Sequence, residues 1–94
     1  MFYVYILKCF DGSYYVGQTD NLIKRIVEHN SGEMGGYTAE RLPVVMVYHA
    51  SFTTRDDALK TEAQIKGWSR AKKEALITGN IETLKDSAKK IHFT

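Results

Sequence analysis

Two tyrosines near the start of the chain, Tyr5 and Tyr15, have a spacing that can place two phenol groups beside one ligand. A hairpin with a three-residue loop at 10–12 would pair Tyr5 with Gly17, and both tyrosines would then share a face of the sheet. A two-residue loop at 11–12 would put them on opposite faces. Because Gly17 has no side chain, the first register leaves space for a ligand to approach the strand. Aromatic packing in the core is the alternative interpretation.

A second pair of candidates, Arg25 and His29, lies on a helix expected over residues 20–31. The two are four residues apart and therefore lie on one helix face. At 100° per residue both fall just outside the apolar arc that runs from Leu22 to Val27. From this position they can reach a cleft beside the sheet. The alternative is a solvated arginine and a half-buried histidine.

Glu62 is the most informative single residue, because it falls inside the apolar arc of a helix expected at about 55–67, close to Leu59. An unpaired carboxylate there would be costly to desolvate, so we expect it to meet a cation. One interpretation is a salt bridge to Arg25 or Arg55. The other is a hydrated Mg²⁺, which often needs only one or two protein carboxylates.

Basic residues gather in one stretch of the sequence. Residues 60–73 contain five Lys or Arg and one Glu, a local excess of +4, with Trp68 among them. Such a stretch can follow a phosphate backbone without reading its sequence, although a charge run can equally be a solvated helix face. The candidate nucleic-acid-binding residues are Lys66, Arg70, Lys72 and Lys73.

Six elements in the order ββαβαα are predicted to position these residues, which implies a small α+β sheet with helices packed on it. The predicted strands cover 2–9, 14–18 and 44–52, and the helices cover 20–31, 55–67 and 70–78. Thr19 or Asp20 is expected to cap the first helix, Thr53-Thr54 the second and Ser69 the third. The third strand is the most apolar, so we expect it to be central. The glycine-rich stretch 32–43 is expected to be an irregular connection of the kind that often carries function.

Length and composition fit one small domain, predicted at 1–80 with a polar tail at 81–94. The chain has 94 residues, 44% of them hydrophobic and 26% charged, and a net charge of +2, too small to indicate a nucleic-acid binder by itself. Cys9 is the single cysteine, so we expect no disulfide or thiolate zinc site, and we expect Cys9 to pack in the core. No apolar run reaches the roughly 18 residues of a membrane span, and a cytoplasmic location is expected.

Taken together, these residues resemble the GIY-YIG nuclease domain, in its short stand-alone bacterial branch. The similarity covers roughly residues 2–78. The segments that carry it are Tyr3-Val4-Tyr5, Tyr15-Val16-Gly17, Asn21 to Arg25, Glu28 to Gly32, Asp57 to Glu62 and Ile65 to Lys73.

The resemblance implies a small three-stranded antiparallel sheet flanked by helices, and divalent-metal-dependent hydrolysis of phosphodiester bonds. It implies that Tyr5 and Tyr15 are the motif tyrosines, one of which activates or orients the attacking water. Arg25 would stabilise charge on the phosphate, and His29 would assist proton transfer. Glu62 would hold the metal ion, Mg²⁺ or Mn²⁺.

Three functional hypotheses follow. The leading one is an endonuclease that cuts DNA, or RNA as a second substrate class, and selects structure rather than sequence in repair or recombination. The second is a nucleic-acid-binding module of the same fold with little or no turnover, motivated by the modest charge and by Gln18, where some relatives have a lysine. The third is a nuclease subunit that needs a protein partner for specificity.

Overall fold

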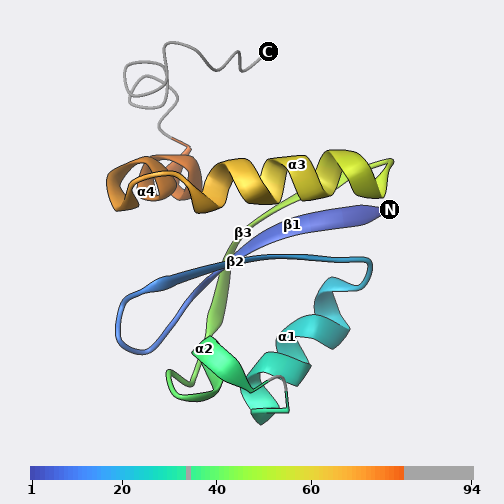
Figure 1. Cartoon of the computed structure of the whole chain (residues 1–94). Coiled ribbons are helices and arrows are strands. Elements are labelled where there is room, and N and C mark those ends of the chain that lie inside the picture. The colour runs from blue at the N-terminus through green and yellow to red at the C-terminus, as the bar shows by residue number, and fades with distance from the viewer. Residues whose placement is uncertain (34, 80–94) are drawn as a thin grey trace.

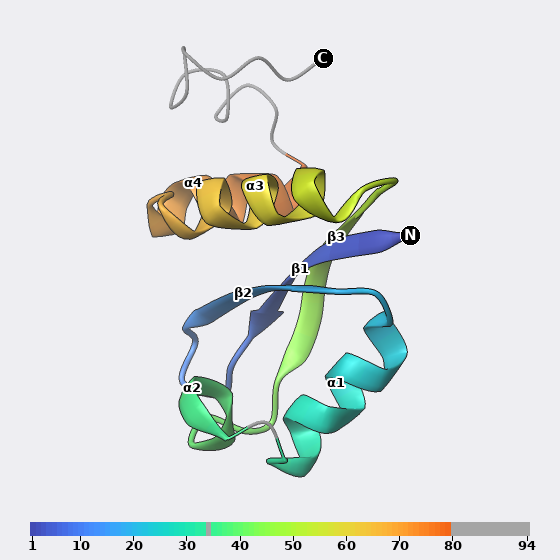
Figure 2. The same ribbon diagram turned by 45° about the vertical axis from the view of Figure 1, so that its right-hand side comes forward.

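A computed structural model describes residues 1–33 and 35–79. It contains a three-stranded antiparallel sheet in the order β2-β1-β3. The strands are β1 (Phe2–Lys8), β2 (Tyr14–Thr19) and β3 (Val45–Phe52), and the helices are α1 (Leu22–Ser31), α2 (Gly36–Ala39), α3 (Arg55–Lys66) and α4 (Arg70–Thr78). Helices α1 and α2 lie on one side of the sheet and α3 and α4 on the other (Figures 1 and 2). This confirms the predicted α+β fold. The predicted tail at 81–94 lies outside the described residues.

The β1–β2 hairpin has the three-residue loop that places both tyrosines on one face. The backbone N–H of Cys9 donates to the carbonyl of Ser13 at 2.8 Å, and Gly12 takes the left-handed conformation with φ of 85°. Tyr5 pairs with Gly17, as the loop length predicts. A loop one residue shorter would have turned every side chain of β2 to the opposite face.

The central strand is β1, and the expectation that the third strand is central is wrong. Val4 and Ile6 pack toward α3, whereas Tyr5 and Leu7 pack toward the other layer, and all four are at most 1% exposed. β3 leaves Val45 61% exposed. Hydrophobic content alone did not identify the central strand, because burial on both faces shows as an unbroken apolar run of the kind that β1 carries.

Helix α1 is rotated relative to the arc expected from its apolar residues. Ile23 and Val27 are 79% and 62% exposed, whereas His29 is 2% exposed. The histidine can be buried because both ring nitrogens find partners, which removes the cost of desolvating them. The N-cap is Asn21, whose side chain accepts from the N–H of Lys24, rather than Thr19 or Asp20.

The two C-terminal helices begin and end close to the predicted positions. Thr54 caps α3 and Ser69 caps α4, each by accepting a backbone N–H three residues ahead, and Gly79 ends α4 in the left-handed conformation. The connection at 32–43 contains the short helix α2, which its glycines did not indicate. Cys9 is buried as expected. None of the described helices is long and apolar enough to cross a membrane.

Candidate active site

A chain of hydrogen-bonded side chains links the central strand to the α1–α2 layer. The hydroxyl of Tyr5 lies 3.0 Å from Nε2 of His29, and Nδ1 of the same ring lies 2.8 Å from Oγ1 of Thr38. All three residues are at most 2% exposed. The ring of Tyr15 packs edge-on against His29, with ring centroids 5.1 Å apart. The structure therefore brings Tyr5, Tyr15 and His29 together, and adds Thr38, which the sequence did not single out.

Arg25 and Glu62 belong with this cluster because both change the pKa of Tyr5. Burial raises the pKa of Tyr5 well above its ordinary value, and the neighbouring Tyr15 raises it further. The Arg25 guanidinium opposes this rise, whereas the Glu62 carboxylate adds to it. Of the residues that the sequence predicted for catalysis, His29 thus contacts the Tyr5 hydroxyl, and Tyr15, Arg25 and Glu62 all shift its pKa. Tyr5 keeps its proton at neutral pH and can donate a hydrogen bond.

His29 is held in its neutral form. Burial lowers the pKa of its imidazole, Arg25 lowers it further, and Glu28 opposes the shift. A neutral imidazole has one ring nitrogen that donates and one that accepts. His29 can therefore take a hydrogen bond from Tyr5 while it donates to Thr38.

This buried histidine makes stability depend on pH. The folded protein binds a proton on His29 less tightly than the unfolded chain does. Neutral His29 therefore contributes to the free energy of unfolding above the ordinary pKa of 6.5, and this contribution is lost as the pH falls. We expect the free energy of unfolding to fall more between about pH 7.5 and about pH 5 in the wild type than in His29→Gln. Urea unfolding at both pH values measures this. His49→Gln, which removes an exposed histidine of β3, is the control. Parallel declines in wild type and His29→Gln would contradict the assignment.

Gly17 does not leave space for a ligand, contrary to the sequence-based expectation. A Cβ placed on Gly17 would meet the Tyr5 hydroxyl and would lie 2.6 Å from its ring carbon Cζ. The space above the glycine is therefore occupied by the Tyr5 ring itself. Because Gly17 has no side chain, the Tyr5 ring can pack against β2 at this point and reach His29.

Replacing Gly17 should displace Tyr5. We expect Gly17→Ala to lower the free energy of unfolding by about 1–3 kcal/mol, because the added methyl overpacks a buried ring in contact with His29. Chemical denaturation measures the change. Gly67→Ala is the matched control, because its Cβ would make only an ordinary contact at 3.5 Å with the Gln64 carbonyl. Equal stability of the two variants would show that Tyr5 is not held by this contact.

Glu62 has a partner other than those the sequence suggested. Its carboxylate lies 3.0 Å from Nζ of Lys66, one helical turn on, rather than against Arg25 or Arg55. The Glu62 side chain is 17% exposed, beside the buried Ala58 and Ile65. Leu59, expected in the same apolar arc, is 43% exposed.

The donor set near Glu62 suits one class of metal ion. Among residues 1–33 and 35–79, no three or more His, Cys, Asp or Glu side chains converge as a metal cage. This excludes a closed structural zinc site in that part of the chain. A single, partly exposed carboxylate fits Mg²⁺, which keeps several water ligands and uses few protein ones. Such an ion would compete with Lys66 for the carboxylate.

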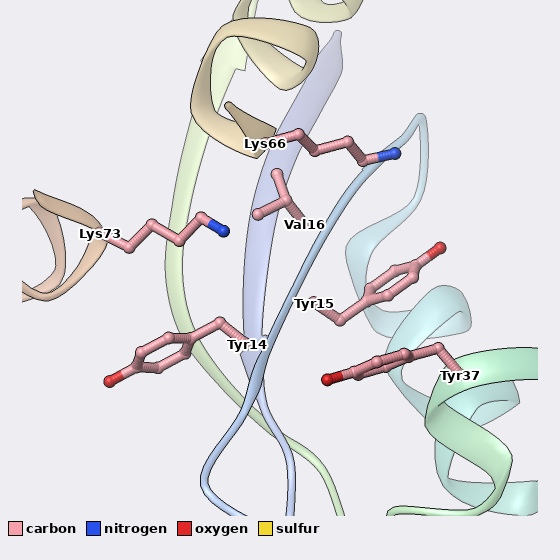
Figure 3. Close-up of a pocket in the computed structure, with 6 residues that line it drawn as sticks. All are labelled: Tyr14, Tyr15, Val16, Tyr37, Lys66 and Lys73. Carbon is pink, nitrogen blue, oxygen red and sulfur yellow. The ribbon is translucent and has the colours of Figure 1, made fainter. Parts of the chain in front are cut away.

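A pocket of about 260 Å³ lies next to the cluster, along the outer strand β2. In Figure 3 the side chains of Lys66 and Lys73 extend toward β2 from α3 and α4, and the rings of Tyr15 and Tyr37 lie on the other side of the strand. Tyr14 and Val16 complete the lining. Tyr5 is 1% exposed and does not line this pocket, so Tyr15 is the motif tyrosine that can touch a bound molecule.

Tyr37 is a site residue that the sequence did not identify. Its ring stacks on Tyr15 with centroids 6.4 Å apart. Arg41 holds it in place: the guanidinium lies 3.9 Å from the Tyr37 ring centroid, donates to the Tyr37 carbonyl and forms an ion pair with Asp11 at the hairpin loop. The one signal available was the length of the glycine-rich connection at 32–43, which indicated function without indicating a residue.

The predicted nucleic-acid-binding residues do not all face this pocket. Lys66 and Lys73 line it, and Lys73 has no ion pair among the described residues. Arg70 donates to the carbonyl of Gly12 at 2.7 Å and packs over the ring of Tyr14. Lys72 is 8% exposed, with its ammonium 4.2 Å from the Trp68 ring centroid.

The sheet order and this cluster of tyrosine, arginine, histidine and glutamate define the class of the protein. Residues 1–75 match the GIY-YIG catalytic domain, and the chain belongs to the GIY-YIG family. This is a nuclease family, so the domain implies a nucleic-acid substrate.

Similar proteins are short and single-domain. The chain is 49% identical over 76 residues to a UPF0213 protein of Staphylococcus saprophyticus, covering 81% of this chain and 93% of that one. It is 43% identical over 76 residues to a UPF0213 protein of Halobacterium salinarum, covering 81% of this chain and 99% of that one. The solution structure of the UPF0213 protein BH0048 from Bacillus halodurans has a TM-score of 0.55 at 42% identity and covers 83% of this chain and 84% of that chain.

Proposed function

We propose that this chain is a divalent-metal-dependent endonuclease that hydrolyses phosphodiester bonds in DNA. The observation that carries the proposal is the Tyr5 hydroxyl, which contacts His29 and lies in the combined field of Tyr15, Arg25 and Glu62. Phosphodiester hydrolysis needs a proton removed from water, positive charge at the phosphate and stabilisation of the leaving oxygen. The cluster offers a group for each requirement.

The proton-handling groups are arranged in two layers. Tyr15 lines the pocket and orients the attacking water through its hydroxyl. Behind it, neutral His29 accepts a hydrogen bond from the Tyr5 hydroxyl. An ordinary tyrosine, with a pKa near 10, keeps its own proton at neutral pH and is a poor base, so the proton from water would pass to the Tyr5 oxygen as the Tyr5 proton moves to Nε2 of His29. Thr38 fixes the orientation of the imidazole from the other side.

The charge-stabilising groups lie on two helices. Arg25 on α1 presents its guanidinium to the phosphate, whose oxygens match the fork of donors that an arginine offers. Glu62 on α3 would hold Mg²⁺ or Mn²⁺, which supplies positive charge to the phosphate oxygens and to the leaving oxygen. Lys66 and Lys73 would bind neighbouring phosphates along the pocket.

Substrate choice is proposed to rest on DNA shape rather than sequence. Sequence readout needs side chains that reach base edges in a groove, usually from a helix or a finger added to the catalytic domain. The charged residues that line the pocket beside Tyr15 are Lys66 and Lys73, whose ammonium groups suit phosphates rather than base edges. This arrangement favours branched, nicked or flapped DNA, as cut in repair or recombination.

The test is cleavage of a panel of labelled substrates: branched, nicked and single-stranded DNA, and RNA of matched sequence, with Mg²⁺ or Mn²⁺. We expect cutting of at least one DNA form that stops with a chelator. We also expect Glu62→Ala and Arg25→Ala to lose this cutting. Cleavage that survives in both variants would place the reaction elsewhere.

One observation favours a second function, a nucleic-acid-binding module without turnover. The carboxylate of Glu62 already has a cationic partner in Lys66 at 3.0 Å, and a fixed ion pair would exclude a metal ion. Salt-dependent DNA binding with no product, unchanged in Glu62→Ala, is the result expected of such a module.

A further inference from the structure

A second pocket, of about 100 Å³, lies at the opposite end of β2 from the tyrosine–lysine pocket. The first pocket is bordered by the start of β2, at Tyr14–Val16, and the second by its end, at Gln18 and Thr19, and by Asp20. Residues that line the second pocket are Phe2, Gln18, Thr19, Asp20, Arg25 and Arg55. In Figure 1, α3 begins above the end of β2, which is where Arg55 enters the lining.

The charges in this second pocket are two guanidinium groups against one carboxylate. Arg55 has no ion pair within 4.0 Å in the part of the chain that the structure describes, because Glu62, the partner expected from the sequence, pairs with Lys66. Nε of Arg25 is buried without a hydrogen-bond acceptor among the described residues, and lies 3.4 Å from the Glu28 carboxylate. Two arginines whose donors are not fully used face one small polar pocket.

Arg25 connects this pocket to the reaction site, since it lines the pocket and also acts on the Tyr5 hydroxyl. Tyr15 and Thr19 are four residues apart on one strand, or roughly 13 Å, which equals the rise of about four nucleotides along a duplex strand. A nucleic-acid strand that passes Tyr15 and follows β2 would thus reach Arg55 within a few nucleotides of the cut.

We propose that this second pocket binds another phosphate of the strand being cut, with Arg55 as its principal contact. The proposal rests on the proposed function and adds a subsite to it. An arginine can bind a phosphate through two parallel hydrogen bonds, which fixes the orientation of the strand as well as its affinity. Lys66 and Lys73 would then hold the strand on one side of the reacting phosphate and Arg55 on the other.

The experiment measures DNA binding without cutting, in a Glu62→Gln background, with a labelled nicked duplex at several salt concentrations. We expect Arg55→Gln to weaken binding about tenfold and to reduce the slope of log K against log salt by about 0.7–0.9, the loss of one phosphate contact. Lys60→Gln is the matched control, because Lys60 lies exposed on the same helix and lines neither pocket. It removes the same charge and should leave the slope close to that of the parent.

A second measurement locates the contact. Neutral methylphosphonates replace one phosphate of the strand at a time, and binding should weaken at a linkage a few nucleotides from the cut in the parent but not in Arg55→Gln. Equal slopes for Arg55→Gln and Lys60→Gln would overturn the subsite, even if the wild type cuts DNA. Absence of cutting by the wild type, with a reduced slope for Arg55→Gln, would overturn the nuclease and leave the subsite standing.

Discussion

Glu62→Gln should reduce DNA cleavage by about 10³-fold while the protein stays folded and still binds DNA. The amide keeps the size of the side chain but loses the charge that a divalent cation needs. The ion pair with Lys66 is partly exposed, with 17% of the Glu62 side chain and 53% of the Lys66 side chain accessible. Its loss should therefore change the free energy of unfolding by no more than about 1 kcal/mol. Single-turnover cleavage and urea unfolding measure the two effects separately.

Asp56→Asn provides the control for this variant, because it removes an exposed carboxylate from the first turn of the same helix. Its cleavage rate should stay within a few-fold of the wild type. DNA affinity of Glu62→Gln should hold or rise, since one negative charge near the phosphates has been removed. Cleavage by Glu62→Gln at a rate close to that of Asp56→Asn would exclude Glu62 as the metal ligand.

Arg25→Lys should reduce turnover by about 10²-fold with a smaller effect on KM. Lysine keeps the positive charge but not the planar fork of donors. Arg25 is placed where that fork matters: its Nε is buried, its guanidinium opposes the upward shift of the Tyr5 pKa, and it lines the second pocket. Steady-state kinetics on the best DNA substrate of the panel measures both parameters.

The neighbouring Lys24, exposed on the outer side of α1, gives the control. Lys24→Gln loses a full charge and should change turnover by less than a few-fold. The double variant Arg25→Lys/Glu62→Gln should be little slower than Glu62→Gln alone, because residues that act as one unit do not contribute additively. Wild-type turnover in Arg25→Lys would show that the guanidinium is not used at the phosphate.

The fold was predictable where a local signal had one physical meaning. Thr54 and Ser69 are caps followed by helical periodicity, and Gly12 is where a three-residue loop needs a left-handed residue. These positions set the ends of α3 and α4 and the register of the hairpin. That register in turn placed Tyr5 and Tyr15 on one face.

The sequence-based predictions were wrong where a residue's environment depends on partners distant in sequence. His29 looked like a residue at the margin of an apolar arc, but Tyr5 and Thr38 satisfy its ring nitrogens and allow it to be buried. Gly17 was expected to leave space for a ligand, but the ring of Tyr5 fills that space. No local pattern reports a hydrogen bond to a residue 24 positions away.

The partner of Glu62 shows the same limit within one helix. The sequence required a cation near this carboxylate and offered three: Arg25, Arg55 and a metal ion. The structure places Lys66 there, four residues on, at 3.0 Å. That choice leaves Arg25 and Arg55 to face the second pocket, which no reading of the sequence had indicated.

The most direct test of a metal-dependent cleavage centre at Glu62 is to locate where Mn²⁺ binds. In a ¹⁵N-labelled sample, paramagnetic Mn²⁺ broadens the amide signals nearest to it. We expect broadening to begin around Glu62 and across the sheet at Gly17, and to disappear in Glu62→Gln. Broadening centred instead on Asp56 and Asp57, with Glu62 and Gly17 unaffected, would contradict it.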